Sequence, residues 1–168
     1  MRTDRKKVVI GVMGGGTIAE KDRDAAYRLG SLVARQGWIL LNGGRPSGIM
    51  EASAKGARDC GGTTVGILPG TDPASASEYV DIRICTGMGD ARNVINVLSS
   101  DIVIACPGSA GTISELAIAL KSRKKVILLN FDVGALFDQY AREGLLTRAE
   151  TPEEAIESVK DFLTKTGR

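Results

Sequence analysis

The feature that most constrains the fold is a repeating pattern along the chain. Each repeat has a short apolar run, then a turn that contains glycine, then a segment with helical periodicity. The runs at residues 8–13, 38–41, 63–68, 101–106 and 125–130 are largely continuous in apolar residues rather than alternating. Such runs are typical of parallel strands that are buried on both faces. Strands that alternate with helices through short connections favour a parallel sheet covered by helices on both sides.

The segments between these runs predict helices. We expect helices from about residue 22 to 36, at 49–60, at 90–98 and at 116–121. A last helix is expected to start after Thr151. Thr151 suits the N-cap, Pro152 the first helical position and Glu154 the third. The run at residues 80–85 alternates more than the others, which places it nearer a sheet edge.

Together these elements predict the α/β class, as a Rossmann-like three-layer α/β/α sandwich with a mainly parallel sheet. The chain has 168 residues, and domains mostly run to ~100–200 residues. Residues 1–168 are therefore expected to form a single Rossmann-like nucleotide- or phosphate-binding domain.

Composition excludes several chemistries. The chain has no histidine, which excludes histidine-based catalysis and zinc sites that need imidazole. Net charge is +2 without a basic block, and only seven residues are aromatic (one Trp, three Tyr, three Phe), so we expect no nucleic-acid partner. Cys60, Cys85 and Cys106 form no CxxC pair and are expected as buried free thiols, with no metal site.

No segment indicates a membrane or an export signal. Every apolar run is far shorter than the ~20 residues needed to span a bilayer. The basic start of the chain is followed by an apolar run that stops at Gly14 without a small-residue cleavage pattern. We therefore expect a cytoplasmic protein without a membrane partner.

Glycine concentrates where the predicted strands end. There are 21 glycines, well above the usual ~7%, and they cluster at residues 13–17, 42–48, 69–70, 87–92 and 107–112. The carboxyl ends of parallel strands share one edge of the sheet. Backbone N–H groups that no side chain covers, and the N-termini of helices that start there, favour the binding of phosphate. The predicted phosphate-binding residues are Gly14, Gly15, Gly16, Thr17, Gly43, Gly44, Arg45, Arg92, Gly108, Ser109, Ala110, Gly111 and Thr112. Neither GxxxxGK[ST] nor GxGxxG occurs, so no P-loop and no NAD fingerprint is predicted.

Two charged residues have alternative interpretations. Thr112 and Glu115 match a capping box, in which Thr112 caps a helix and Glu115 bonds back to it; Thr17 and Glu20 fit the same template. Glu115 could instead act as a general base or stabilise a developing cation. Arg92 is either a surface cation or a guanidinium held in a fixed position that binds phosphate or carboxylate oxygens. The basic residues of segment 121–125 are expected on a solvated face.

Residues 107–115, Pro-Gly-Ser-Ala-Gly-Thr-Ile-Ser-Glu, resemble the PGGxGTxxE signature of the Lonely Guy (LOG) and lysine-decarboxylase-like proteins, and the similarity extends over residues 7–130. It implies a Rossmann-like fold and, in LOG enzymes, hydrolysis of the N-glycosidic bond of a cytokinin or purine nucleoside 5′-monophosphate. Arg92 and Glu115 match the positions thought to be catalytic there, and residues 108–112 match the phosphate loop. Ser109 stands where the PGGxGTxxE signature has its second glycine. No pyridoxal-phosphate site is evident, so lysine decarboxylation is not favoured.

The segments 11–14, 37–45, 61–70 and 90–100 also resemble the molybdenum cofactor (Moco) carrier proteins. That resemblance implies a non-enzymatic homo-oligomer, a dimer or tetramer, that holds the phosphate of a pterin and protects its cargo until delivery. We favour a carrier with Moco as bound cargo. The alternatives are a LOG-like phosphoribohydrolase and a nucleotide-sensing module without turnover, so whether the chain is an enzyme stays open here.

Overall fold

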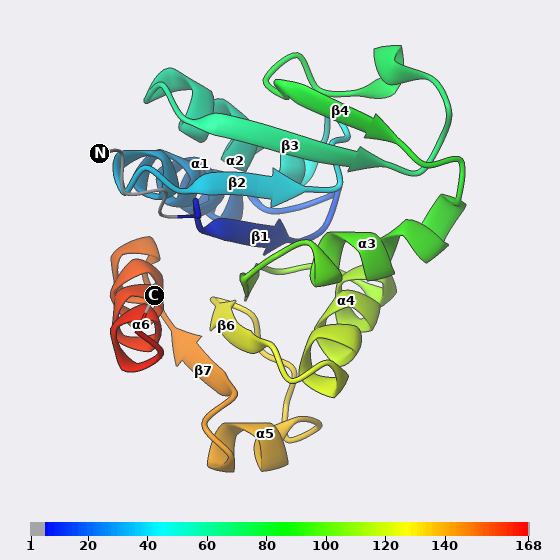
Figure 1. The fold of residues 1–168 in the computed structure, drawn as a ribbon. Coiled ribbons are helices and arrows are strands. Elements are labelled where there is room, and N and C mark those ends of the chain that lie inside the picture. Colours follow the sequence, from blue (N-terminus) through cyan, green and yellow to red (C-terminus); the bar gives the residue numbers. More distant parts are fainter. Residues whose placement is uncertain (1–5, 168) are drawn as a thin grey trace.

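The computed structural model describes residues 6–167 and contains a seven-stranded sheet in the order β4-β3-β2-β1-β5-β6-β7 (Figure 1). All six neighbouring pairs of strands are parallel. The strands are β1 (Val9–Met13), β2 (Ile39–Asn42), β3 (Thr63–Leu68), β4 (Ile82–Cys85), β5 (Ile102–Ala105), β6 (Lys125–Leu129) and β7 (Leu146–Ala149).

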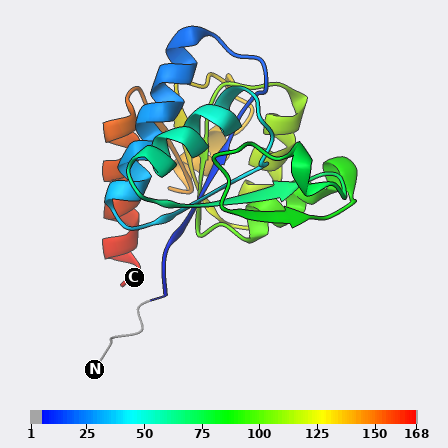
Figure 2. The same ribbon diagram turned by 90° about the horizontal axis from the view of Figure 1, so that it is seen from above.

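Helices cover both faces of this sheet, which confirms the predicted Rossmann-like three-layer sandwich. Figure 2 shows α1, α2 and α6 on one side of the strands and α3 and α4 on the other. The helices are α1 (Glu20–Arg35), α2 (Gly48–Asp59), α3 (Asn93–Leu98), α4 (Ala110–Lys121), α5 (Asp138–Arg142) and α6 (Pro152–Lys165), with short 3₁₀ turns at Pro73–Ser75 (η1) and Gly89–Arg92 (η2).

Two apolar cores explain why the strand sequences are apolar at successive positions. On β5, Ile102 and Ile104 pack with α1, α2 and α6, whereas Val103 and Ala105 pack with α3 and α4. Successive side chains of a strand point to opposite faces, so a strand between two helical layers needs apolar residues at every position.

The strand order reverses beside β1, which pairs with β2 on one side and with β5 on the other. The chain builds the sheet outward from β1 to β4, then returns to place β5 against the free side of β1. The connections that leave β1 and β5 therefore pass to opposite faces and open a crevice beyond the ends of these two strands. Residues 14–16 and 107–109 lie at that crevice.

The last helix begins as predicted, because Thr151 is its N-cap and the Thr151 hydroxyl accepts from the Glu154 N–H at 3.2 Å. Two elements, α5 and β7, were not predicted. They are five and four residues long, and β7 is an edge strand whose sequence Leu-Thr-Arg-Ala has a buried residue only at each end. So short a pattern carries no recognisable period.

Two expectations about burial are wrong. Of the three cysteines expected to be buried, only Cys106 is. Cys60 is partly buried, and Cys85 is exposed because β4 is an edge strand with every residue exposed. Lys125, expected on a solvated face, is buried at the start of β6 and donates to the carbonyl of Gly144 at 2.9 Å and to the hydroxyl of Thr147. Burial, and secondarily the charge of Lys165, lowers the pKa of Lys125.

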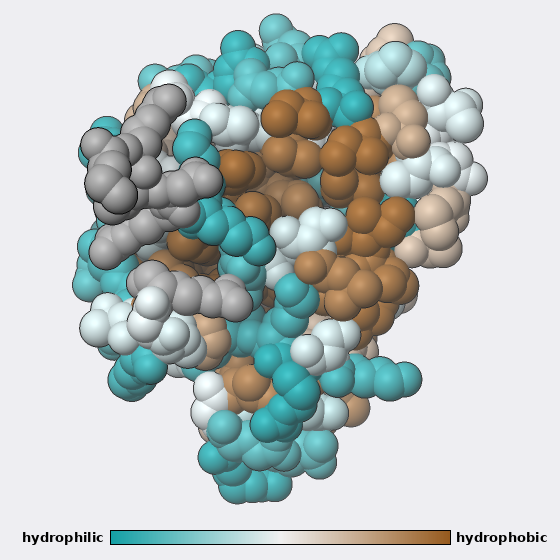
Figure 3. Space-filling model, in the orientation of Figure 1, coloured by the Kyte–Doolittle hydropathy of each residue, from teal (hydrophilic) through white to brown (hydrophobic). Residues whose placement is uncertain are grey.

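One face of the sheet is left partly bare. Ile82 and Ile84 of β4 are 50% and 43% exposed, and Val94 and Leu98 of α3 are exposed beside them. Ile82 pairs in register with Val65. Figure 3 shows hydrophobic side chains gathered over β3, β4 and α3. This exposed apolar face, made of these five residues, is uncommon on the surface of a monomer.

Within residues 6–167 no helix has the length and apolar character to cross a bilayer.

Helices α1 and α2 touch through their backbones. A Cβ atom on Gly30 of α1 would lie 2.0 Å from the carbonyl oxygen of Ser53, and one on Gly56 of α2 would lie 1.9 Å from the carbonyl oxygen of Tyr27. Neither carbonyl belongs to a flexible side chain, so a methyl group at either position forces the two helices apart.

We therefore expect Gly30→Ala or Gly56→Ala to lower the free energy of unfolding by about 1–3 kcal/mol, the usual cost of overpacking. This outweighs the better helix propensity of alanine, which is worth at most ~1 kcal/mol. Urea denaturation measures the difference. The matched control is Gly70→Ala, where a Cβ meets nothing within 4 Å. Equal loss in the control and the helix variants would contradict this account of the packing.

Candidate functional site

Two adjoining cavities lie beyond the carboxyl ends of β1 and β5. The first, here called the Arg92 cavity, has a volume of about 150 Å³, and the second, the Asp22 cavity, about 490 Å³. The second lies within the range of ~300–1,000 Å³ typical of small-molecule sites, and the first opens beside it. They share Gly15, Gly16 and Ser109 and together form one cleft.

Most of the predicted residues line this cleft. The Arg92 cavity contains Gly14, Gly15, Gly16, Gly43, Arg92, Ser109, Gly111, Thr112 and Glu115, and the Asp22 cavity adds Thr17 and Gly108. Gly44, Arg45 and Ala110 line neither cavity. Gly44 instead adopts a left-handed conformation (φ 73°) and donates to the Asn42 side chain at 2.8 Å, which shapes the turn after β2.

The floor of the cleft is a direct contact between two glycine loops. The N–H of Gly15 donates to the carbonyl of Pro107 at 2.9 Å. A Cβ on Gly108 would lie 2.9 Å from the Gly15 nitrogen and 2.1 Å from the Thr112 hydroxyl oxygen. Any side chain at Gly108 would separate the loops, so a bare backbone is required at this point.

Helix α4 begins at the cleft with free N–H groups. Its N-cap is Ser109, whose side chain makes no capping hydrogen bond. A Cβ on Gly111 would meet nothing within 4 Å, so the first turn is open to a ligand. The positive end of a twelve-residue helix with unsatisfied donors favours an anion.

The predicted capping boxes are wrong. Because Ser109 is the N-cap, Thr112 lies inside the first turn of α4 and Glu115 begins the second turn, too far along to bond back to the helix start. At the start of α1 the N-cap is Ala19, so Thr17 and Glu20 form no capping box either. A serine or threonine upstream of an apolar run marks the region of a helix start but not its residue.

Arg92 is not a surface cation. It ends η2 beside the start of α3 and is only 9% exposed. Its Nη1 donates to the Asn93 side-chain oxygen at 3.1 Å, while its buried Nε has no partner. A Cβ on Gly43 would lie 2.7 Å from Nη2, so the guanidinium rests against bare backbone. Burial lowers the pKa of Arg92; the charge of Glu115 opposes that shift and the charge of Arg45 adds to it.

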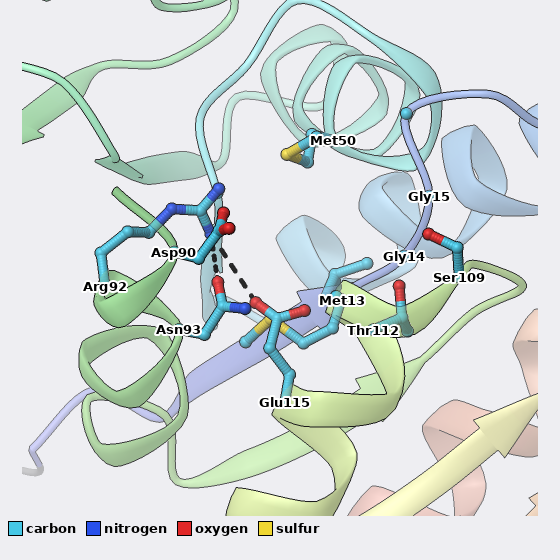
Figure 4. Close-up of a pocket in the computed structure, with 14 residues that line it drawn as sticks. Met13, Gly14, Gly15, Met50, Asp90, Arg92, Asn93, Ser109, Thr112 and Glu115 are labelled. Atoms are coloured by element: carbon cyan, nitrogen blue, oxygen red, sulfur yellow. Dashed lines mark hydrogen bonds and ion pairs between the residues drawn. The ribbon is translucent and has the colours of Figure 1, made fainter. Parts of the chain in front are cut away.

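Glu115 faces Arg92 across the cavity (Figure 4). Its Oε1 lies 3.7 Å from Arg92 Nη1 and accepts a hydrogen bond from Asn96 Nδ2 at 2.8 Å, and the residue is 6% exposed. Burial raises the pKa of Glu115, although the Asn96 hydrogen bond and the Arg92 charge oppose this. A carboxylate with raised proton affinity beside a guanidinium can exchange a proton or stabilise a positive centre.

Several residues of the cleft were not predicted. Met50, Asp90 and Asn93 line the Arg92 cavity, and Asp22 lines the other. Asp90 and Asn93 lie within two residues of Arg92 in the sequence, so their proximity to a predicted site residue could have identified them. Met50 and Asp22 lie inside helices and reach the cleft only because α2 and α1 begin there. Among residues 6–167 no cluster of three or more His, Cys, Asp or Glu side chains could hold a metal ion.

Comparisons with known proteins match a family model and two solved structures to most of the chain. The model of the SLOG cluster4 family matches residues 7–156. A solved structure of the molybdenum cofactor binding protein from Rippkaea orientalis is 47% identical, with a TM-score of 0.88, and the match covers 94% of this chain and 98% of that one. The molybdenum cofactor carrier protein from Chlamydomonas reinhardtii is 44% identical, with a TM-score of 0.88 and coverage of 95% and 99%.

Relatives with an enzymatic name are less similar to the chain. A probable cytokinin riboside 5′-monophosphate phosphoribohydrolase of Oryza sativa is 31% identical over 161 residues, which cover 83% of this chain and 72% of that protein. The cytokinin riboside 5′-monophosphate phosphoribohydrolase of Mycobacterium tuberculosis is 37% identical over 95 residues, which cover 55% of this chain and 51% of that protein. This chain therefore matches about half the length of that hydrolase.

The raised pKa of Glu115 predicts a pH-dependent stability difference between the wild type and Glu115→Gln. The folded protein binds this proton more tightly than the unfolded chain, whose glutamate has a pKa near 4.5. The stability that this tighter proton binding adds is complete below that pH. It is lost as pH rises through the higher pKa of Glu115 in the folded protein. Relative to Glu115→Gln, the wild type should thus gain stability in denaturant titrations as pH falls through the raised pKa of folded Glu115 toward 4.5. A constant or opposite difference would refute the burial account.

Proposed function

Since the chain belongs to the SLOG cluster4 family, we propose that its cleft binds the phosphate of a small molecule and that the cargo is the molybdenum cofactor. The observation that carries this proposal is the near-complete match, at 44–47% identity, to two solved molybdenum cofactor proteins. The phosphoribohydrolase relatives are less similar, at 37% identity over 55% of the chain and 31% identity over 83% of it.

The start of α4 is the proposed phosphate position. Free N–H groups of its first turn, the Ser109 hydroxyl and the positive end of the helix meet there without a covering side chain. Arg92 adds a fixed positive charge on the opposite wall of the cavity. Phosphate binding through backbone donors explains the bare glycines of both loops.

The cleft is suited to hold a metal-bearing cargo without taking the metal away. The chain has no histidine. Burial raises the pKa of the Cys106 thiol, next to the cleft, to about 12, so it stays protonated near neutral pH. A thiolate rather than a thiol binds metals, so Cys106 does not compete for the cargo's metal. Ser109 and Thr112 hydroxyls can approach its oxo groups.

A LOG-like phosphoribohydrolase is the second candidate, favoured by the buried pair of Arg92 and Glu115 at 3.7 Å. In that reaction Arg92 orients the phosphosugar. Glu115 stabilises the oxocarbenium-like centre or activates the water that replaces the base. The nucleotide-sensing module without turnover would use the same cleft for binding alone.

The proposed carrier is a homo-oligomer, dimer or tetramer, as the resemblance to carrier proteins implies. The exposed apolar face over β3, β4 and α3 supports this assignment, because a second copy of the chain would remove it from water.

The carrier proposal predicts that the purified protein, incubated with free Moco without oxygen, elutes with molybdenum and slows oxidative loss of the cofactor. Ser109→Asp should weaken retention about tenfold or more, because a carboxylate at the start of α4 repels phosphate. The matched control is Ser109→Asn, an equally good N-cap without charge. Mass and metal analysis provide the readout. Absence of protection, or equal retention by the Asp variant, would reject the carrier.

The hydrolase is tested on the same preparation with a panel of nucleoside 5′-monophosphates. If the chain is a carrier, no free base is released above the uncatalysed rate. Release that disappears in Glu115→Ala would replace the carrier with the hydrolase, because only the hydrolytic mechanism requires that carboxylate. Release at the same rate in both proteins would point to a contaminant.

A further inference from the structure

We infer that the Asp22 cavity selects the ring of the ligand, and that Asp22 binds a ring edge with adjacent N–H and NH₂ donors. The 2-amino-4-oxopyrimidine edge shared by guanine and pterins is of this kind. The inference rests on the proposed function, because it assumes that the ligand's phosphate lies at the start of α4.

The two cavities divide the cleft into chemically different halves. The ion pair of Arg92 and Glu115 lines the first cavity together with Asp90, so that half holds the one positive charge among the cleft residues that the structure describes. Asp22 is the sole charged residue among those that line the second, whose other walls are main chain and small or apolar side chains such as Ile18 and Ala19. A phosphate is repelled by Asp22, whereas a flat uncharged ring suits these walls.

The phosphate position and the Asp22 cavity share a wall. Ser109, the N-cap of α4, lines both cavities, and so do Gly15 and Gly16. Because Gly15 and Gly16 carry no side chain, a ligand whose phosphate lies at Ser109 can extend over them into the Asp22 cavity.

The Asp22 carboxylate has unused acceptor capacity. It lies in the first turn of α1, is partly buried, and has no side-chain hydrogen bond or ion pair with any residue of the segment 6–167. Its charge contributes to the raised pKa of the buried Cys106 thiol, so these two groups lie close enough to interact. Glu20 and Asp24 of the same helix are exposed and line neither cavity.

This chemistry discriminates between ring types. An ionised carboxylate only accepts hydrogen bonds, and its two oxygens match two parallel donors. Guanine and pterins present such a pair of donors. Adenine presents one amino group beside a ring nitrogen that is itself an acceptor, so one carboxylate oxygen would face a lone pair. A site with a buried polar group rejects the ring that leaves it unpaired.

The test compares GMP with AMP by calorimetry, because the two share phosphate and ribose and differ only in the ring. The wild type should bind GMP about tenfold or more tightly than AMP. In Asp22→Asn, and in Asp22→Ala as a second variant, the ratio should fall to within about threefold. The matched control is Asp24→Asn, which removes an exposed carboxylate of the same helix and should keep the preference. Thermal melting verifies that each variant is folded.

The outcomes separate this inference from the proposed function. Equal binding of GMP and AMP by the wild type, or a preference that survives in both Asp22 variants, overturns the role of Asp22 and leaves phosphate binding intact. Ser109→Asp should weaken both nucleotides and preserve their ratio. If neither nucleotide nor inorganic phosphate binds the wild type, phosphate binding at α4 fails, and the ring selection that depends on it fails too.

Discussion

The site depends on one backbone contact, between the loop after β1 and the loop after β5. The Gly15 N–H donates to Pro107, and Gly108 lies so close that a Cβ would overlap both loops. These strands are neighbours in the sheet although Val12 and its partner Ile104 lie 92 positions apart in the sequence. The reversal of strand order creates the crevice, and the absence of side chains keeps it open.

The buried pair of Arg92 and Glu115 is costly for a protein that needs only to fold. Both groups lose hydration, their closest approach is 3.7 Å, and Arg92 Nε and Asn96 Oδ1 have no hydrogen-bond partner. Replacement of a buried ion pair by apolar residues is often neutral or stabilising. This cost supports the proposal that the pair belongs to a binding site whose remaining donors and acceptors serve a ligand.

The division of the cleft into two halves connects the proposed cargo with the fold. Helix α4 begins at the shared wall, where we propose that the anion binds, and α1 brings a carboxylate to the second cavity. A ligand that is anionic at one end and rich in N–H donors at the other satisfies both halves. A pterin phosphate has this arrangement, and the relatives named for the molybdenum cofactor match this chain over nearly its full length.

The sequence by itself determined the α/β class, the strands buried between two helical layers, and the edge at which the glycine loops gather, because these follow from local periodicity and from the direction of parallel strands. Only the tertiary structure decided that Ser109 rather than Thr112 caps α4, that Arg92 and Glu115 meet, and that Asp22 faces the cleft while Gly44, Arg45 and Ala110 do not. The short α5 and β7 also escaped prediction, since they have too few residues to show a period. These features depend on contacts between residues distant in the chain and on the rotation of each helix, neither of which a local pattern specifies.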